Sequence, residues 1–189
     1  MLRRRAPGFT LIEVMITVAI VGVLAVLATL AYRRWTRSAY LVEAQDMVSS
    51  IRSAEIAFYS ENGAYLNVTT GVGVGHSYPA TQPGAFKTAW GGPCAVCPSP
   101  TAWEALNVRA SGPVAFGYSC VAGDGSKNGS ASGIGTITVN GQALNLSAMD
   151  GSPWFFVEAD ANMSGDGKSY QHVYGMSGTS EIYVDGEGN

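Results

Sequence analysis

The stretch Phe9–Ala31, FTLIEVMITVAIVGVLAVLATLA, decides how the rest of the chain must be understood. At about 1.5 Å per residue, a helix of this stretch would be about 34 Å long, enough to cross a hydrocarbon core of about 30 Å. Arg3, Arg4 and Arg5 precede it, so the basic end is expected in the cytoplasm. We therefore predict a membrane-spanning helix near the N-terminus.

A secretory signal peptide is one alternative for this segment. Its apolar region would be shorter, and small residues would mark a cleavage site after that region. Here the apolar stretch is long, and Gly8 stands immediately before Phe9 at its start. Cleavage between Gly8 and Phe9 is therefore favoured, and the apolar helix would stay in the mature protein.

Glu13 argues against a second alternative, a plain membrane anchor. A carboxylate inside an apolar helix costs about 2.5–3.5 kcal/mol in lipid on insertion scales unless it is paired or protonated. Its natural partner is the new α-amino group of Phe9 that cleavage would free. We expect this pair to form between neighbouring subunits, because first-turn geometry points the two groups differently within one helix.

The Arg-rich leader, Gly8 and the run Phe9-Thr10-Leu11-Ile12-Glu13 resemble the prepilin peptidase signature shared by type IV pilins and type II secretion pseudopilins. The resemblance covers about residues 3–63. It implies cleavage after Gly8 by prepilin peptidase, N-methylation of Phe9, and Glu13 as the residue that aligns an incoming subunit. The implied partners are other pilin subunits and an inner-membrane assembly platform. The implied location is the inner membrane for the prepilin, then an extracellular pilus or a periplasmic pseudopilus.

The resemblance also implies the α+β pilin fold, in which a long N-terminal helix packs on a C-terminal antiparallel β-sheet. Spacings of three and four residues extend the helix to Asn62, where Gly63 ends it. The predicted buried stripe consists of Tyr40, Leu41, Ala44, Met47, Val48, Ile51, Ala54 and Phe58, with Glu43, Asp46, Arg52, Glu55 and Glu61 mostly elsewhere. We expect a leader at 1–8, a membrane and filament-core helix at 9–32, its amphipathic half at 33–62, and a globular domain at 63–189.

The globular part is expected to be rich in β-strands, since it holds all but two of the 24 glycines. Thr101-Ala102-Trp103-Glu104 matches a capping box and predicts a short helix through about Val108. Alternating or apolar segments predict strands near 114–120, 134–138, 154–159, 170–174 and 181–184. The apolar face of their sheet is expected to lie on the stripe of the long helix.

Two features lie at the middle of the long helix. Many major pilins carry a proline where this chain has Leu30, and its absence favours a continuous helix and a minor pilin or pseudopilin. An aromatic and cationic girdle follows, made of Tyr32, Arg33, Arg34, Trp35 and Arg37. It is expected to anchor the chain at the outer interface of the membrane that the helix spans. In a fibre its arginines could pair with acids of a neighbour.

The net charge argues against nucleic-acid binding, and the placement of the histidines argues against nucleophilic catalysis. The net charge is −3, and loss of three leader arginines would take it to −6. No basic nucleic-acid footprint is therefore evident. His76 and His172 have no serine or cysteine in an elbow motif nearby, so we expect no enzyme and no cofactor.

The three cysteines, Cys94, Cys97 and Cys120, would face an oxidising compartment. The Cys94–Cys97 spacing is typical of a redox motif, but Pro98 and Pro100 follow and no βαβ pattern surrounds it. A zinc site would need more ligands. We predict a structural disulfide from Cys120 to either Cys94 or Cys97, which leaves one cysteine unexplained.

The run Asp160–Asp166 follows the opening spacing of a calcium loop, with oxygen ligands at alternate positions and a glycine sixth. Gln171 stands at the twelfth position, where a bidentate glutamate is needed. An Asx-rich turn between strands is therefore favoured, and no metal site is predicted.

These inferences converge on a non-enzymatic structural subunit of a type IV pilus, an apparatus for adhesion, motility or DNA uptake. A type II secretion pseudopilin that drives protein export is the alternative within the family. A membrane-anchored periplasmic enzyme or binding protein would need neither Glu13 nor a cleavage before the apolar helix.

Overall fold

The computed structural model describes residues 8–84, 86–92, 100–125, 134, 137–144, 146 and 151–186. The chain divides into two compact units, Met1–Ala39 and Tyr40–Asn189. Helix α1, Leu11–Asn62, is continuous through both, as the pattern of apolar residues predicts. Gly63 follows it with a φ of 72°, a left-handed conformation that suits a helix C-terminus.

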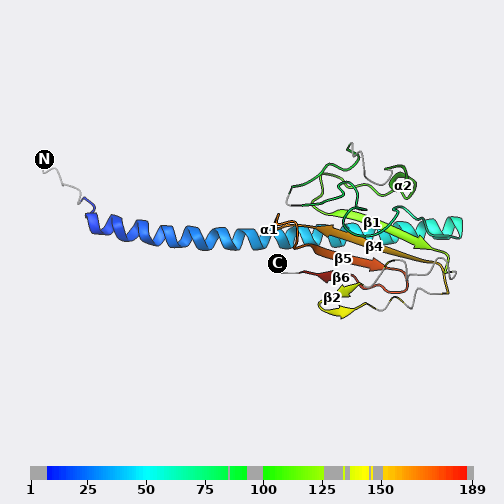
Figure 1. The fold of residues 1–189 in the computed structure, drawn as a ribbon. Helices are drawn as coiled ribbons and strands as arrows, with labels where there is room; N and C mark the ends of the chain where they lie inside the picture. Colours follow the sequence, from blue (N-terminus) through cyan, green and yellow to red (C-terminus); the bar gives the residue numbers. More distant parts are fainter. Residues whose placement is uncertain are drawn as a thin grey trace. The chain divides into compact units, whose positions relative to one another are not determined.

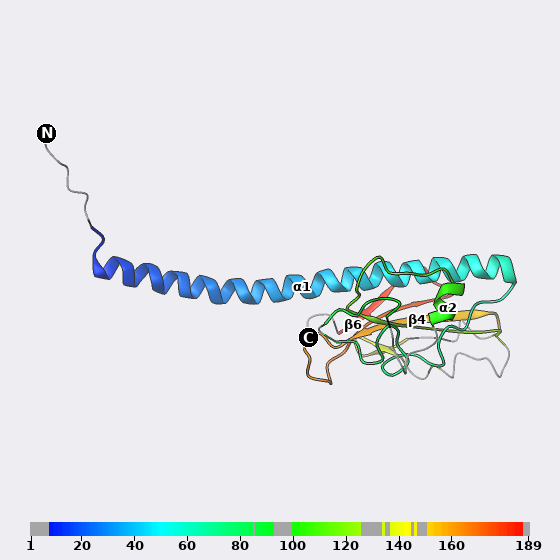
Figure 2. The ribbon, with the colours of Figure 1, turned by 90° about the horizontal axis from the view of Figure 1, so that it is seen from above.

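The second unit contains the C-terminal part of α1, the short helix α2 and two sheets (Figures 1 and 2). The main sheet is antiparallel with the order β1-β4-β5-β6, and a small hairpin pairs β2 with β3. The bounds are α2 Pro100–Ala105, β1 Gly117–Gly123, β2 Thr138–Val139, β3 Gln142–Ala143, β4 Trp154–Ala161, β5 Gln171–Met176 and β6 Tyr183–Asp185. The expected α+β fold with an antiparallel sheet is confirmed, and β1, β4, β5 and β6 match expected strands with ends shifted by up to three residues. The expected strand 134–138 lies partly outside the described residues, and β3 was not predicted. The short helix expected through about Val108 ends at Ala105.

The main core lies between α1 and one face of the sheet, as expected. The buried residues of α1 are Leu41, Ala44, Val48, Ile51 and Glu55, and those that face them from the sheet include Cys120, Phe155, Val157, Ala159 and Val173. The predicted stripe contacts the core, but the fully buried face is turned about the helix axis from its predicted centre. Tyr40, Met47, Ala54 and Phe58 are therefore only partly buried. A second apolar cluster on the opposite face of the sheet contains Trp154, Phe156, Tyr174 and Met176.

Glu55 corrects the sequence interpretation, which placed it away from the buried face. It is fully buried, and its carboxylate accepts hydrogen bonds from the Leu66 N–H at 2.9 Å and the Cys120 thiol at 3.3 Å. These two donors belong to the chain just after α1 and to the central part of β1. A carboxylate is tolerated here because both of its oxygens have a donor.

Gly175 sets the distance between α1 and β5. A Cβ atom at this position would lie 2.7 Å from Val48 Cγ1 and 2.7 Å from Arg52 Cδ, closer than two carbon atoms can approach. Arg52 then crosses the strand and donates to the carbonyl groups of Thr179 and Ser180. The helix therefore lies directly on β5 because this residue has no side chain.

Candidate functional site

The first helical turn is held by a capping box that the sequence analysis did not identify. The Thr10 hydroxyl accepts a hydrogen bond from the Glu13 N–H at 3.3 Å, and Glu13 Oε2 accepts from the Thr10 N–H at 3.4 Å. Thr10 is thus the N-cap and Glu13 the third helical residue, a pattern readable from Thr-x-x-Glu. An acid in the first turn also suits the positive end of the helix dipole.

This arrangement leaves the carboxylate of Glu13 available to other chains. Its contacts to Thr10 are long, at 3.4 and 3.5 Å, and the side chain is exposed. Gly8 and Phe9 precede the helix without regular structure, and the side chain of Phe9 is 82% exposed. The Gly8–Phe9 bond therefore lies in exposed, non-helical chain, a conformation that a peptidase can bind.

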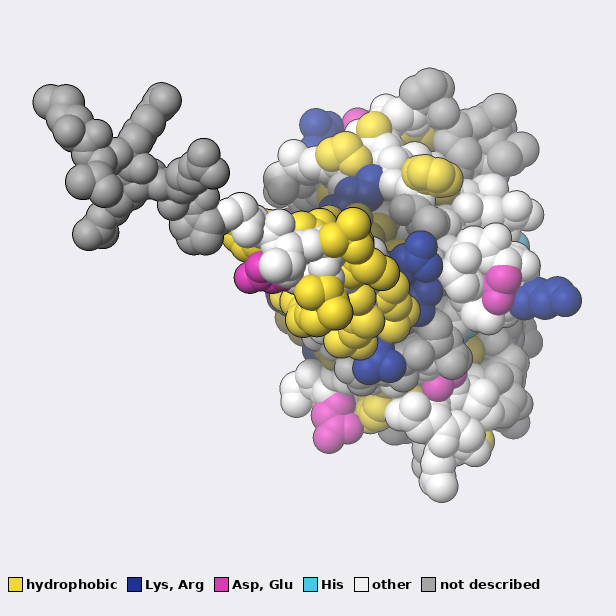
Figure 3. All heavy atoms as spheres, turned by 90° about the vertical axis from the view of Figure 1, so that its left-hand side faces the viewer, with side chains coloured by type: hydrophobic (Ala, Val, Ile, Leu, Met, Phe, Trp, Pro, Cys, Tyr) yellow, Lys and Arg dark blue, Asp and Glu magenta, His cyan; other side chains and the backbone are white. Residues whose placement is uncertain are grey.

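The N-terminal part of α1 exposes its apolar side chains on all sides. Figure 3 shows hydrophobic side chains covering the end of this helix that faces the viewer. Every residue from Leu11 to Trp35 is exposed. By length and composition, α1 is the one helix in the described part of the chain that could cross a membrane. Such a surface requires lipid or other protein to cover it.

Cys120 is the one end of the predicted disulfide that the structure describes, so the disulfide stays a prediction. Cys120 is a free thiol with no exposed surface, and it donates its hydrogen bond to Glu55. Burial first, then the charge of Glu55, raise the pKa of this thiol well above its ordinary value. Its two expected partners, Cys94 and Cys97, lie outside the described residues. The sequence did not indicate that the Cys120 thiol would donate a hydrogen bond to the buried carboxylate of Glu55.

The Asp160–Asp166 run begins in the last two residues of β4 and continues into a hydrogen-bonded turn from Asn162. The amide oxygen of Asn162 accepts from the Ser164 hydroxyl and the Gly165 N–H, while Asp166 accepts from the N–H groups of Lys168 and Ser169. Hydrogen bonds from Ser169 hold the pKa of Asp166 well below its usual range. The carboxylates of this run therefore have partners within the chain, as an Asx-rich turn requires.

Asp160 and His172 belong to a polar cluster on the outer face of the main sheet. The Ser77 hydroxyl donates to Asp160, and His172 Nδ1 lies 2.9 Å from the Glu158 carboxylate. Asp160 and Glu158 are both buried. Nowhere in the described residues do three or more His, Cys, Asp or Glu side chains converge as a metal site would need.

Comparison with known proteins finds relatives of the N-terminal segment. Residues 3–29 match the prokaryotic N-terminal methylation motif. The N-terminal part of this chain is similar to that of type IV pilins. A fimbrial protein of Neisseria meningitidis serogroup A is 41% identical over 70 residues, and the type IV major pilin protein PilE of Neisseria gonorrhoeae is 41% identical over 70 residues. The type IV major pilin protein PilA of Myxococcus xanthus is 35% identical over 69 residues.

The similarity between this chain and its relatives is confined to part of each chain. The match covers 37% of this chain and 41% of the meningococcal protein, and 36% of this chain and 31% of the Myxococcus protein. The matched part thus spans about two fifths or less of the relatives' length. No solved structure gives a significant match to this chain.

Proposed function

We propose that this chain is a structural, non-enzymatic subunit of a type IV pilus. The single observation that carries the proposal is the combination of a methylation motif at residues 3–29 with an apolar helix whose surface is fully exposed. The exposed helix alone would also suit a membrane-anchored enzyme or binding protein, but such a protein would need neither Glu13 nor the methylation motif before the helix. A filament covers it with the same helix of other subunits.

Processing would occur at the exposed Gly8–Phe9 bond. In this proposal prepilin peptidase removes residues 1–8 at the inner membrane, and the new N-terminus at Phe9 is methylated. An inner-membrane platform then adds the subunit to an extracellular filament. The exposed, non-helical position of Gly8 and Phe9 supports the first step, because a peptidase must reach the bond that it cleaves.

Assembly would use the charge of Glu13. The carboxylate is unfavourable in lipid on its own, and the α-amino group of a neighbouring subunit neutralises it at the start of the filament-core helix. The capping box orients the carboxylate without burying it, so that its charge remains to be neutralised.

The pseudopilin alternative receives less support. The relatives reported above are named fimbrial proteins or type IV major pilin proteins. These names favour a surface pilus over a secretion pseudopilus for this chain.

The proposal is tested by replacing Gly8 with phenylalanine in the full chain, in a cell that assembles pili. Intact mass should show an uncleaved prepilin with no methyl group, and sheared filaments should lack it. Gly22→Ala is the matched control, because an added Cβ there meets nothing within 4 Å and the variant should be cleaved and assembled. Uncleaved protein in filaments at the wild-type ratio of filament to membrane pool would refute the processing step.

A further inference from the structure

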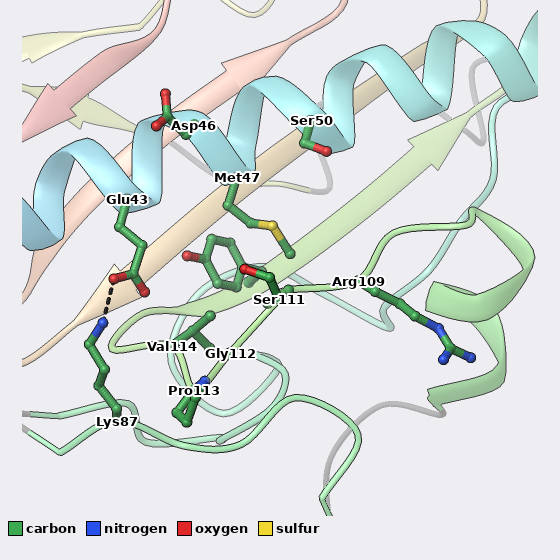
Figure 4. Close-up of a pocket in the computed structure, with 12 residues that line it drawn as sticks. Glu43, Asp46, Met47, Ser50, Lys87, Arg109, Ser111, Gly112, Pro113 and Val114 are labelled. Atoms are coloured by element: carbon green, nitrogen blue, oxygen red, sulfur yellow. Dashed lines mark hydrogen bonds and ion pairs between the residues drawn. The ribbon is translucent and has the colours of Figure 1, made fainter.

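A groove runs between α1 and the segment that follows α2. Its volume is about 780 Å³, and its walls include Glu43, Asp46 and Met47 of α1 on one side and Ser111 and Pro113 on the other, with Tyr118 of β1 also lining it. Figure 4 shows Glu43, Met47 and Ser50 on the helical wall. The groove lies entirely within the second unit, and the apolar N-terminal helix takes no part in it.

Two polar atoms in this groove are buried without a hydrogen-bond partner in the described part of the chain, Glu43 Oε1 and the Tyr118 hydroxyl. The whole side chain of Tyr118 is inaccessible. Burial, and then the charge of Glu43, raise the pKa of this phenol, so its hydroxyl stays protonated at any physiological pH. An unpaired buried polar group destabilises the fold, and an occupant with suitable donors would remove that penalty.

The cations near the groove are already engaged. Lys87 donates to Glu43 Oε2 at 2.6 Å and lies over the ring of Tyr40 at 4.8 Å. Arg109 pairs with Glu104 at 3.2 Å. Asp46 is exposed on the helical wall and has no ion pair within the described residues. The groove therefore offers a free carboxylate oxygen, a second carboxylate and a phenol oxygen, all of which can accept hydrogen bonds.

A guanidinium group fits this set of acceptors. It carries five N–H donors in a planar fork, has no acceptor of its own, and stays charged at all physiological pH values. The chain itself supplies such groups: Arg33 and Arg34 are exposed and have no ion pair in the part of the chain that the structure describes.

We propose that the groove beside α1 receives an arginine of the Arg33–Arg34 pair from a second copy of this chain. The proposal rests on the proposed function, since filament assembly is what brings the α1 helices of several copies together. The docked guanidinium pairs with Asp46, the exposed acid of the groove. Side-chain movement on docking opens Glu43 Oε1 and the Tyr118 oxygen to its remaining N–H groups. Two surfaces then bring the copies together. One is the acidic groove in the second unit, which selects an arginine, and the other is the apolar helix surface of the first unit.

A charge-swap experiment in living cells tests the docking between copies. Asp46→Arg alone, and Arg33→Glu or Arg34→Glu alone, should each lower the ratio of filament to membrane pool at least several-fold. Co-expression of Asp46→Arg with the correct arginine variant should restore both chains to the filament, because each chain lacks what the other provides. Glu61→Arg is the matched control, being an exposed acid on α1 outside the groove, and it should neither reduce assembly nor rescue the arginine variants.

Two outcomes separate this inference from the proposed function. If wild-type chains are absent from filaments, the proposed function is wrong. If wild-type chains assemble and Asp46→Arg assembles equally well, or if co-expression restores nothing, the docking is wrong. A loss with Arg33→Glu and Arg34→Glu that Asp46→Arg does not rescue would assign these arginines to lipid headgroups instead.

Tyr118→Phe gives a second test whose two readouts move in opposite directions. It removes a hydroxyl that has no partner in the described part of the isolated subunit, so the melting temperature of the full chain in detergent should stay the same or rise. Filament incorporation should fall, because the docked guanidinium loses an acceptor. Unchanged incorporation of a stably folded Tyr118→Phe variant would contradict the role of this residue in docking.

Discussion

At the scale of single residues, Glu13 has two roles that one substitution can separate. Its carboxylate caps the first turn of α1 through Thr10, and its charge is available to a neighbouring subunit. Glu13→Gln keeps the capping geometry, since glutamine serves equally at the third helical position, but removes the charge. We expect α1 to remain helical and incorporation into filaments to fall by roughly tenfold or more, the size of a lost charge-assisted hydrogen bond.

Thr10→Val is the matched variant for that test. It removes the cap while leaving the carboxylate, so helix content near the N-terminus should fall slightly and incorporation should stay close to wild type. The quantity measured is the amount of each variant in sheared filaments relative to the membrane pool. Should Thr10→Val assemble poorly and Glu13→Gln assemble normally, capping and not charge would be the function of Glu13.

At the scale of elements, the contact between α1 and β5 depends on Gly175. Gly175→Ala would place a methyl group 2.7 Å from Val48 Cγ1, so the helix or the strand must shift. Overpacking of this kind costs about 1–3 kcal/mol of unfolding free energy. Val48→Ala alone leaves a cavity and is also destabilising.

The double variant Gly175→Ala, Val48→Ala should lose less stability than the two single variants together, because each change relieves the other. Chemical denaturation of the full chain in detergent measures all three. Gly112→Ala is the control, since a Cβ there meets nothing within 4 Å and its φ is not in the left-handed region. Strict additivity of the two single effects would show that Val48 and Gly175 do not limit each other.

The long helix was predictable because its signals are local. The spacing of apolar residues, the length of the apolar stretch and the helix end at Asn62-Gly63 can all be read from residues close in sequence. The Thr10–Glu13 capping box is equally local. Glu55 was placed wrongly because its burial depends on the Leu66 N–H and the Cys120 thiol. Nothing in the amphipathic pattern distinguishes a buried, hydrogen-bonded glutamate from a solvated one.

At the scale of the whole molecule, the contacts that close the globular unit join residues distant in sequence. Ser77 donates to Asp160 across 83 positions, and Arg52 reaches the carbonyl of Ser180 across 128. Alternation predicts a strand but not its neighbour, so the sheet order β1-β4-β5-β6 and the groove at Tyr118 could not be derived. The N-terminal methylation motif could be recognised from residues adjacent in sequence, whereas the second unit was predictable only as a class of fold.

The outer-face cluster makes the stability of the whole second unit depend on pH. Burial, and then the charge of Glu158, raise the pKa of Asp160 from 3.8 to about 7, although the hydrogen bond from Ser77 opposes this. For His172 burial lowers the pKa, but the hydrogen bond and charge of Glu158 and the charges of Asp160 and Asp185 outweigh it and raise the pKa overall. Burial likewise raises the pKa of Glu55 on the other face.

The raised pKa values of Asp160, His172 and Glu55 all make the folded chain less stable as the pH rises. The folded chain holds a proton on Asp160 between about pH 4 and pH 7 where the unfolded chain has lost it, so stability falls as the pH rises through this range. Protonated His172 stabilises the fold below about pH 6.5, and this contribution is lost as the pH rises through its raised pKa. The unfolding free energy should therefore be higher at pH 5 than at pH 8 by about 2–3 kcal/mol.

Asp160→Asn tests which group carries the effect. Asparagine can still accept from Ser77 but does not ionise, so the difference in unfolding free energy between pH 5 and pH 8 should shrink to the smaller part that His172 and Glu55 contribute. Asp166→Asn is the control, because the pKa of Asp166 is lowered and its titration lies below pH 4, outside the window. Urea denaturation of the full chain in detergent at the two pH values measures each difference. A wild-type difference that survives in full in Asp160→Asn would show that the buried carboxyl on β4 is not the group that titrates, and a stability that rises with pH would contradict the sign for all three.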